Sequence, residues 1–220
     1  MRSPFLPRFS DLPAALPIFP LSGAVVMPGV QLPLNIFEPR YLNMVQGALA
    51  SDHLIGMVQP RGNDDAFEDH PPLHRVGCAG RITSYSETND GRIIMVLTGL
   101  CRFEIAEELA LVDGYRRVRP DWGRFADDYV DETAPLVERE AFMGSLRVYC
   151  ERRSVEVPWD DVSKMDDGDL INLLCAHLPL GSEDKQALIE TVNLHDRAQL
   201  MQGLMEMSAH GDMSGTEQRH

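Results

Sequence analysis

The chain has 220 residues, of which 44% are hydrophobic and 25% charged, as in an ordinary soluble globular protein. Its 34 acidic and 20 basic residues leave a formal net charge of −14, which disfavours binding to nucleic-acid backbones. No apolar run approaches the ~20 residues needed to cross a bilayer, so we expect no membrane contact.

The N-terminal segment, residues 1–15, has no continuous apolar core and does not resemble a signal peptide. We expect it to be a flexible arm. The four cysteines are widely and irregularly spaced, which favours reduced thiols over a disulfide framework. Together these features predict a cytoplasmic protein.

The stretch of residues 16–41 alternates short apolar runs with prolines. Proline cannot donate a hydrogen bond to a strand ladder, so we expect edge strands, strand starts or bulged segments here. Such strands suit a small, strongly bent barrel better than a flat central sheet. Pro39 stands where a first helical turn would begin, and apolar residues at helical spacing over 41–49 predict that helix.

Strand signals dominate up to about residue 120. The strongest hairpin signal in the chain is Asn89-Asp90-Gly91. Residues 93–97 are wholly apolar and suit a buried strand, whereas residues 101–105 and 115–119 alternate and predict half-buried strands. The polar, acidic segment 60–72 is expected to be an exposed loop.

After Trp122 the character of the chain changes. Residues 1–120 carry 13 acids and 11 bases, a net charge of −2, whereas residues 121–220 carry 21 acids and 9 bases, a net charge of −12. This contrast predicts two differently built regions. The expected organisation is an N-terminal arm (1–15), a strand-rich part (16–122), an acidic connector (123–133), a helical part (134–207) and a loose tail (208–220).

Four helices are predicted in the helical part. Thr133 is a candidate cap for a long helix that ends near Arg153. Residues 166–178 predict a second helix. Ser182 begins a third helix as an acceptor cap followed by two acids, which complement the helix dipole. Apolar residues over 200–205 mark the last helix.

Three motifs follow one another in sequence order. The first is Phe19-Pro-Leu21 with Ile36-Phe-Glu-Pro-Arg-Tyr41, the second is Thr98-Gly-Leu-Cys-Arg-Phe-Glu-Ile105, and the third is Leu178-Pro-Leu-Gly-Ser-Glu-Asp-Lys-Gln-Ala-Leu-Ile-Glu190. Together they resemble the N-terminal, substrate-binding domain of Lon proteases. The similarity extends from about residue 16 to residue 205, which is most of the chain.

The resemblance implies an α+β fold with an N-terminal PUA-like β-barrel, one or more short helices, and a C-terminal helical bundle. It implies a non-catalytic module that binds unfolded or exposed protein segments and acts as an adaptor or regulator of proteolysis. An ATP-dependent protease is a further partner that the resemblance suggests. A homodimer stays open, because no feature of the sequence decides it.

The sequence departs from a full Lon protease, which carries an ATPase module and a serine–lysine peptidase module. It contains no Gly-x-x-x-x-Gly-Lys-Ser/Thr phosphate loop. Lys164 directly follows Ser163, and adjacent side chains diverge, so the pair makes a poor catalytic dyad. Lys185 belongs to the third motif. We therefore expect a stand-alone substrate-binding domain that is not an enzyme.

His70, His74 and Cys78 could be imagined as metal ligands. Two prolines between the histidines prevent the helix that would align them, and no fourth ligand is near in sequence. Paired acids in polar stretches are more often solvated than catalytic. We expect no metal and no cofactor.

Glu38 and Arg40 flank Pro39 at the predicted strand-to-helix junction. They could form a polar element of a binding groove. Alternatively, the carboxylate holds backbone amides while the guanidinium ties the barrel to the next segment, which is the favoured interpretation. Arg102 has a similar pair of interpretations, as a binding residue or as a surface or junction contact beside a core Phe103.

Val26 and Met27, with the loop 60–72, are candidates for an exposed apolar contact surface, because methionine adapts to varied partners. Packing in the core explains these two residues at least as well. The candidate binding residues are therefore Val26, Met27, Glu38, Arg40 and Arg102.

Two other classes of function stay open. PUA-like barrels include RNA-binding members, and a local basic edge could be formed by Arg116, Arg117 and Arg119, although the overall acidity argues against nucleic acid. A small-molecule sensor or enzyme could use the mouth of the barrel. That alternative needs a deep pocket with convergent polar groups.

Overall fold

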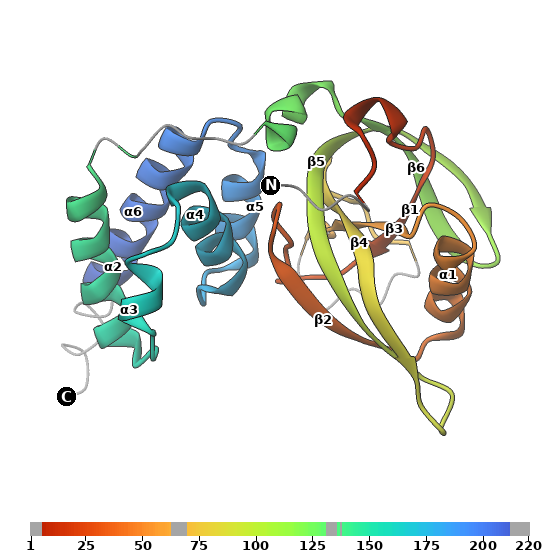
Figure 1. The fold of residues 1–220 in the computed structure, drawn as a ribbon, viewed down its shortest axis with the longest axis horizontal. Helices are drawn as coiled ribbons and strands as arrows, with labels where there is room; N and C mark the ends of the chain where they lie inside the picture. Colours follow the sequence, from red (N-terminus) through yellow and green to blue (C-terminus); the bar gives the residue numbers. More distant parts are fainter. Residues whose placement is uncertain (1–5, 63–69, 131–135, 137, 212–220) are drawn as a thin grey trace.

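The computed structural model describes residues 6–62, 70–130, 136 and 138–211. The fold is of the mixed α+β class: strands fill the first part of the chain and most helices the second, on opposite sides of Figure 1. The strands are β1 (Leu16–Pro20), β2 (Gln31–Ile36), β3 (Leu54–Val58), β4 (Val76–Glu87), β5 (Ile93–Val112) and β6 (Tyr115–Asp121). The helices are α1 (Pro39–Leu49), α2 (Arg139–Arg153), α3 (Trp159–Val162), α4 (Asp167–His177), α5 (Ser182–Glu190) and α6 (Leu194–Gly211), with two 3-10 helices, η1 (Phe9–Asp11) and η2 (Gly123–Tyr129).

The longest strand, β5, organises the sheet. Its first part pairs with β2 and its last part with β6, while β4 pairs with its other edge. The antiparallel pairing of β4 with β3, the parallel pairing of β3 with β1 and the antiparallel pairing of β1 with β6 complete the order. Because β6 also pairs with β5, the order of pairing returns to the strand from which it began.

Pro33 lies in an edge strand, as its missing amide requires. In the described part of the chain, β2 pairs only with β5. The carbonyl of Val30 accepts a hydrogen bond from the Gly99 amide of β5 at 2.8 Å. Because backbone groups alternate in direction along a strand, those of Gln31, Pro33 and Asn35 face away from β5. Pro33 therefore removes no hydrogen bond from the ladder.

The hairpin predicted at residues 89–91 is confirmed, since it joins β4 to β5. Gly91 has a φ of 81°, a left-handed conformation that glycine adopts without strain. The expected wholly buried strand over 93–97 is wrong at Ile94, which is 52% exposed. This part of β5 has its inner face on the core and its outer face toward solvent, so burial alternates.

Helix α1 confirms the helix predicted over 41–49. It begins at Pro39, whose fixed φ suits a first turn, and it buries Tyr41, Met44, Val45 and Ala48. Its buried side packs near β1, β3 and β6. The helix therefore covers one flank of the strand layer and fixes the residues at its own N-terminus.

The helices after residue 138 differ from prediction in three places. The α5 cap position is Gly181 and no side chain caps it, so the acceptor-cap role expected for Ser182 is wrong. The short helix α3 was not predicted. Helix α6 continues to Gly211, into the tail that was expected to be loose from residue 208. The predicted cap Thr133 lies outside the described residues.

The described part of the N-terminal arm is packed rather than free. Leu6, Phe9 and Leu12 pack against the core, and the Phe9 ring meets the edge of Tyr129 at a centroid distance of 5.4 Å. Burial of these apolar side chains holds the segment in place although it has little regular structure. The sequence pattern does not reveal such contacts, so the expectation of a flexible arm is wrong for this part. Residues 1–5 and 63–69, the latter within the predicted loop 60–72, lie outside the described residues.

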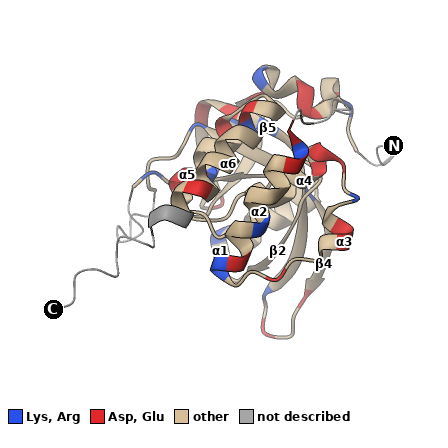
Figure 2. Cartoon of the chain, turned by 90° about the vertical axis from the view of Figure 1, so that its left-hand side faces the viewer, with Lys and Arg blue, Asp and Glu red and all other residues tan. Residues whose placement is uncertain are grey.

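Several acidic residues of the second half lie in the first turns of its helices. Figure 2 shows red segments on α3, α4 and α5, which carry acids in their first turns. Acids at these positions complement the positive end of the helix dipole. Within the described residues, no helix is both long enough and apolar enough to cross a membrane.

Candidate functional site

A cavity of about 440 Å³ lies beside strands β1 and β2, and we call it the β1–β2 cavity. Most of its lining is apolar, contributed by aromatic rings, leucines and prolines. Its polar members are Asn35, Glu38, Arg40, His70 and Arg116. The lining residues are Phe19, Pro20, Leu21, Pro33, Leu34, Asn35, Phe37, Glu38, Arg40, Tyr41, Pro60, His70, Pro71, Gly114, Tyr115 and Arg116.

Strands β1 and β2, which both line the cavity, do not pair with each other in the described residues. The amide of Leu21 donates to the carbonyl of Val58 in β3 at 3.0 Å, so by alternation the backbone of Pro20 faces away from β3. Pro33 of β2 likewise faces away from β5. Neither proline has an N–H, so both remove a donor that a ladder between β1 and β2 would need.

Glu38 and Arg40 lie together at the entrance to helix α1 and line the cavity. The Arg40 guanidinium donates to the Glu38 carboxylate through Nε at 3.1 Å and lies 3.0 Å from it through Nη2. The expected contact of this carboxylate with backbone amides is wrong, because no side-chain hydrogen bond caps α1. A neighbouring arginine offers a stronger, charge-assisted partner than an amide does.

Aromatic rings form one wall of the cavity. Phe19 and Tyr41 meet edge to face with centroids 4.4 Å apart, and the Arg40 guanidinium lies 4.8 Å from the Tyr41 centroid. Burial raises the pKa of the Tyr41 hydroxyl above its ordinary value. Phe37 is 63% exposed at the opening, which is unusual for a ring of that size.

Sequence reasoning missed Phe37 and Arg116 as members of this site. Phe37 could have been found from the sequence. It continues the alternate positions of Pro33 and Asn35, which are exposed, and it is a large apolar residue where a polar one is usual. Arg116 reaches the cavity from β6, a strand far away in sequence. Only the fold brings that strand to β1 and β2.

Two of the three arginines of the basic edge considered for RNA binding form ion pairs with glutamates. Arg116 donates to both oxygens of Glu108 at 2.7 Å and to the Pro71 carbonyl at 2.7 Å. Arg119 lies 2.8 Å from Glu107. These carboxylates compete with any phosphate for the same guanidinium groups, so the structure gives no support to an RNA-binding edge.

Val26 and Met27 do not belong to a surface. Both are 0% exposed, so the alternative of an exposed apolar contact is wrong and that of core packing is right. They lie beside Gly99 of β5: a Cβ added there would overlap the Met27 carbonyl and meet the Val26 side chain. The backbone of Met27 therefore lies against that of Gly99, and this contact buries Val26 and Met27.

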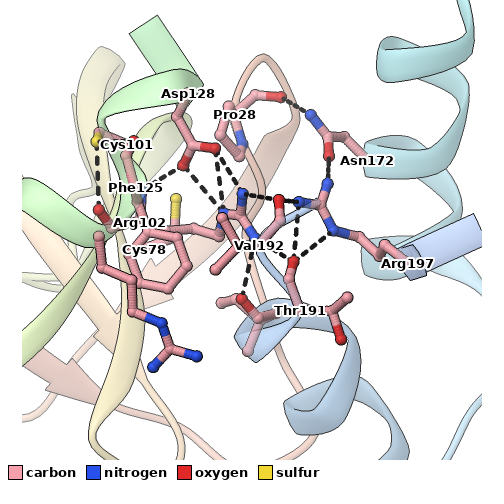
Figure 3. Close-up of polar contacts among 12 residues, drawn as sticks. Pro28, Cys78, Cys101, Arg102, Phe125, Asp128, Asn172, Thr191, Val192 and Arg197 are labelled. Atoms are coloured by element: carbon pink, nitrogen blue, oxygen red, sulfur yellow. Dashed lines mark hydrogen bonds and ion pairs between the residues drawn. The ribbon is translucent and has the colours of Figure 1, made fainter. Parts of the chain in front are cut away.

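Arg102 lies at the junction between the strands and the helices, as Figure 3 shows. Its guanidinium binds the Asp128 carboxylate through Nε and Nη2, with the shortest distance 2.7 Å, and lies 4.6 Å from the Phe125 centroid. The same group donates to the Ile189 carbonyl in the last turn of α5 and to the carbonyls of Thr191 and Val192, which follow the helix.

A second arginine holds the same segment from the other side. Arg197 of α6 donates to the carbonyls of Thr191 and Val192 and to Asn172 Oδ1, and Asn172 in turn donates to the Pro28 carbonyl (Figure 3). Both Arg102 and Arg197 are almost completely buried. The contacts of Arg102 are therefore those of a junction residue. Because its side chain is buried, it is not accessible to a binding partner.

The third sequence motif also forms part of this junction. Lys185 donates through Nζ to the carbonyls of Gly23 at 3.1 Å and Ala176 at 3.0 Å. Desolvation lowers the pKa of its amine. Gln186 accepts from Gln59 at 3.1 Å and donates to the carbonyl of Val76 in β4. The Lys-Gln pair thus joins α5 to the strand-rich part.

The imagined metal ligands are not brought together as a cluster. His74 lies 3.6 Å from Glu183 of α5, and Cys78 is buried in β4, where desolvation raises the pKa of its thiol. Across the described ranges, no three His, Cys, Asp or Glu side chains gather as metal ligands would.

Two solved structures with a similar fold are Lon N-terminal domains. A Lon N-terminal domain protein from Xanthomonas campestris matches with a TM-score of 0.62 and 20% identity, covering 86% of this chain and 97% of the other. The N-terminal domain of the Mycobacterium avium complex Lon protease matches with a TM-score of 0.60 and 18% identity, covering 87% and 98%. These likenesses define the fold.

The sequence defines the family. The model of the ATP-dependent protease La (LON) substrate-binding domain matches residues 15–207, and the chain belongs to this family. Lon protease 2 of Myxococcus xanthus is 28% identical over 213 residues, and the Lon protease of Anaeromyxobacter dehalogenans is 28% identical over 214 residues. Each alignment covers 93% of this chain, but the chain spans only about a quarter of these relatives, 25% and 24%.

Proposed function

We propose that this protein is a non-catalytic module that recognises unfolded or exposed segments of other proteins at the β1–β2 cavity. The observation that carries the proposal is the apolar lining of this cavity, which reaches the surface at the exposed ring of Phe37. Apolar burial does not depend on an exact partner sequence, so such a site suits segments of varied composition.

The polar groups of the cavity favour this function over small-molecule chemistry. Glu38 is bound to Arg40, and Arg116 is bound to Glu108. Within each pair the two charged groups bind each other. A sensor or enzyme for a small polar molecule needs groups that converge on the ligand instead. The sequence also contains no phosphate loop of the Gly-x-x-x-x-Gly-Lys-Ser/Thr type.

The proposal includes three finer points that family membership suggests. The ring of paired strands is a PUA-like barrel over residues 16–122, and the helices over 134–207 form a helical bundle. The module acts in proteolysis as an adaptor or regulator, with an ATP-dependent protease as partner. A homodimer and a cytoplasmic location are compatible with the proposal, and neither is needed for it.

Binding to a permanently unfolded protein tests the proposal. We expect reduced, carboxymethylated α-lactalbumin to bind in the micromolar range in a fluorescence anisotropy titration, and its native form not to bind. Absence of binding to the unfolded form by correctly folded protein, as judged by circular dichroism, would overturn the proposal.

A pair of exposed residues locates the binding. Replacing Phe37 at the cavity with alanine (Phe37→Ala) should weaken binding about tenfold, because a large ring loses its apolar contact. Ile94→Ala is the matched control: Ile94 is similarly exposed, at 52%, but does not line the cavity. Equal effects of the two changes would place the binding elsewhere.

A further inference from the structure

Residues 6–13 of the N-terminal segment have a conformation that repeats about every three residues. Arg8, with φ −69° and ψ 158°, and Leu12, with φ −64° and ψ 140°, both have backbone angles close to those of polyproline II, and the 3-10 turn η1 lies between them. Polyproline II and the 3-10 helix each have about three residues per turn. Side chains three residues apart therefore point to the same side of this segment.

The apolar side chains at this spacing face the body of the protein. Leu6, Phe9 and Leu12 are partly buried and pack against the core, whereas the polar residues between them are exposed. Pro7 and Pro13 follow the first and the last of the three, and a residue before proline is restricted to extended backbone angles. The sequence of this segment thus favours the conformation that it has in the structure.

An aromatic surface at η2 receives this segment, and we call it the η2 surface, defined by Trp122 and Tyr129. The Phe9 ring meets the edge of Tyr129, and Trp122 Nε1 donates to the carbonyl of Pro13 at 3.3 Å. The red turn η1 lies beside the green turn η2 at the top of Figure 1. Aromatic side chains are the usual partners of polyproline II segments, and an indole adds a hydrogen-bond donor.

The η2 surface belongs to the folded body, whereas the segment on it lies outside the sheet. The Trp122 ring packs against the buried Phe103 of β5, with centroids 5.6 Å apart. Among the described residues, the backbone–backbone hydrogen bonds of the segment stay within its own turn, as from the Asp11 amide to the Arg8 carbonyl at 2.9 Å. Residues 6–15 belong to no strand of the described structure. A segment held in this way opens at a low cost in free energy.

We propose that the η2 surface is a second peptide-binding site, for polyproline II segments of other proteins with an apolar side chain at every third residue, and that residues 6–13 occupy it as a displaceable strap. Neither Trp122 nor Tyr129 lines the β1–β2 cavity, so this inference does not depend on the proposed function. The strap is the template for its competitor, with the same spacing and a carbonyl for the indole N–H. Its attachment gives it a high effective concentration, so a partner must displace it.

A labelled peptide tests whether the η2 surface accepts a separate segment. The probe is a fluorescent peptide with the sequence of residues 6–15, and the released-strap variant is the full chain with Phe9→Ser and Leu12→Ser. We expect the probe to bind this variant at least about tenfold more tightly than the parent, whose own strap competes. Arg8→Ser with Asp11→Ser is the control, since both residues are exposed, and it should behave like the parent. Equal binding to all three proteins, or no binding to the folded released-strap variant, would overturn the inference.

Two unlabelled competitors test the preference for polyproline II. A nonapeptide of three Pro-Pro-Leu repeats and one of three Gly-Ser-Leu repeats have the same apolar spacing, but only the first is restricted to this conformation. We expect the proline peptide to displace the probe from the released-strap variant at a concentration about tenfold lower. Equal displacement by the two peptides would overturn the assignment of the site to polyproline II segments.

A tryptophan substitution tests the strap without altering its sequence. Trp122→Phe keeps an aromatic ring but removes the N–H that binds the Pro13 carbonyl, so the strap should open more often. Chymotrypsin cleavage between Phe9 and Ser10, followed by mass spectrometry, should become about fivefold faster. Trp159→Phe is the control, because this second tryptophan lies in α3 and should leave the rate unchanged.

An unchanged cleavage rate in Trp122→Phe would contradict a strap held by the indole. Exchange of the strap between two copies of the chain is the other outcome that the experiments distinguish. In that case the parent would form dimers in sedimentation that the released-strap variant lacks, and the inference would be wrong.

Discussion

The guanidinium of Arg102 and the carboxylate of Asp128 form a buried ion pair, with Nη2 2.7 Å from Oδ1 and with side-chain exposures of 2% and 7%. The Arg102 backbone amide also donates to Asp128 Oδ2 at 2.8 Å. This pair fixes η2 to β5, while the remaining donors of Arg102 bind carbonyls at the end of α5 and just after it. Arg102 therefore contacts both the strand-rich part and the helical part at their junction.

Removing the carboxylate should destabilise the protein strongly. Asp128→Ala leaves the Arg102 charge buried without its carboxylate partner, and we expect the free energy of unfolding to fall by about 3–5 kcal/mol in a urea titration. Glu107→Ala is the control, because its ion pair with Arg119 is exposed and should contribute less than about 1 kcal/mol. Similar losses for both variants would contradict a central role for the junction.

Features that depend on neighbouring residues could be predicted from the sequence, whereas features that depend on contacts between distant residues could not. The helix at Pro39 and the hairpin at Asn89-Asp90-Gly91 follow from local rules on φ angles and turns, and both are confirmed. The family and the mixed α+β class follow from motifs in order. The burial of Val26 and Met27 depends on contact with Gly99, about seventy residues further along the chain, so no local pattern could reveal it.

The candidate site was predictable only in part. Glu38 and Arg40 were found because they flank a proline at a junction, and they do line the cavity. The cavity itself arises from β1 and β2 lying near each other without pairing, and a sequence pattern does not state which strands pair. Arg102 was found as well, but its contacts place it in the junction and away from the cavity.

Because the backbones of Gly99 and Met27 lie close together, we expect alanine to destabilise the protein at position 99 but not at an exposed glycine in a helix. In Gly99→Ala the new Cβ would overlap the carbonyl of Met27, a backbone atom that cannot rotate away, so we expect a loss of at least about 2 kcal/mol in the free energy of unfolding. Gly144→Ala, on an exposed part of α2 with open space around it, should instead stabilise by about 0.5–1 kcal/mol. Thermal or urea unfolding distinguishes the two results, and a neutral Gly99→Ala would contradict the described packing.

Alkaline pH should destabilise the fold through its buried thiols. Burial raises the pKa of Cys175 from 9.0 to about 12, so the unfolded chain releases this proton at a lower pH than the folded protein does. The stabilising effect is present below pH 9 and is lost as pH rises from 9 toward 12. Between pH 9 and about 10.5 this single thiol should account for about 1.5 kcal/mol of lost stability.

Cys175→Ala separates this thiol from other alkaline effects. The variant should be less stable than the parent at pH 7, because its side chain is smaller in a fully buried position. Its free energy of unfolding should nevertheless fall less steeply between pH 9 and 10.5 in urea titrations. Parallel pH profiles for the two proteins would show that the Cys175 thiol does not titrate differently in the folded and unfolded states.

The most direct test of binding at the β1–β2 cavity is to compare Phe37→Ala with Ile94→Ala in anisotropy titrations of unfolded α-lactalbumin. Phe37→Ala should weaken binding about tenfold, whereas Ile94→Ala should leave it unchanged, because only Phe37 of these two exposed residues lines the cavity. Equal binding by the two variants would contradict recognition at this cavity.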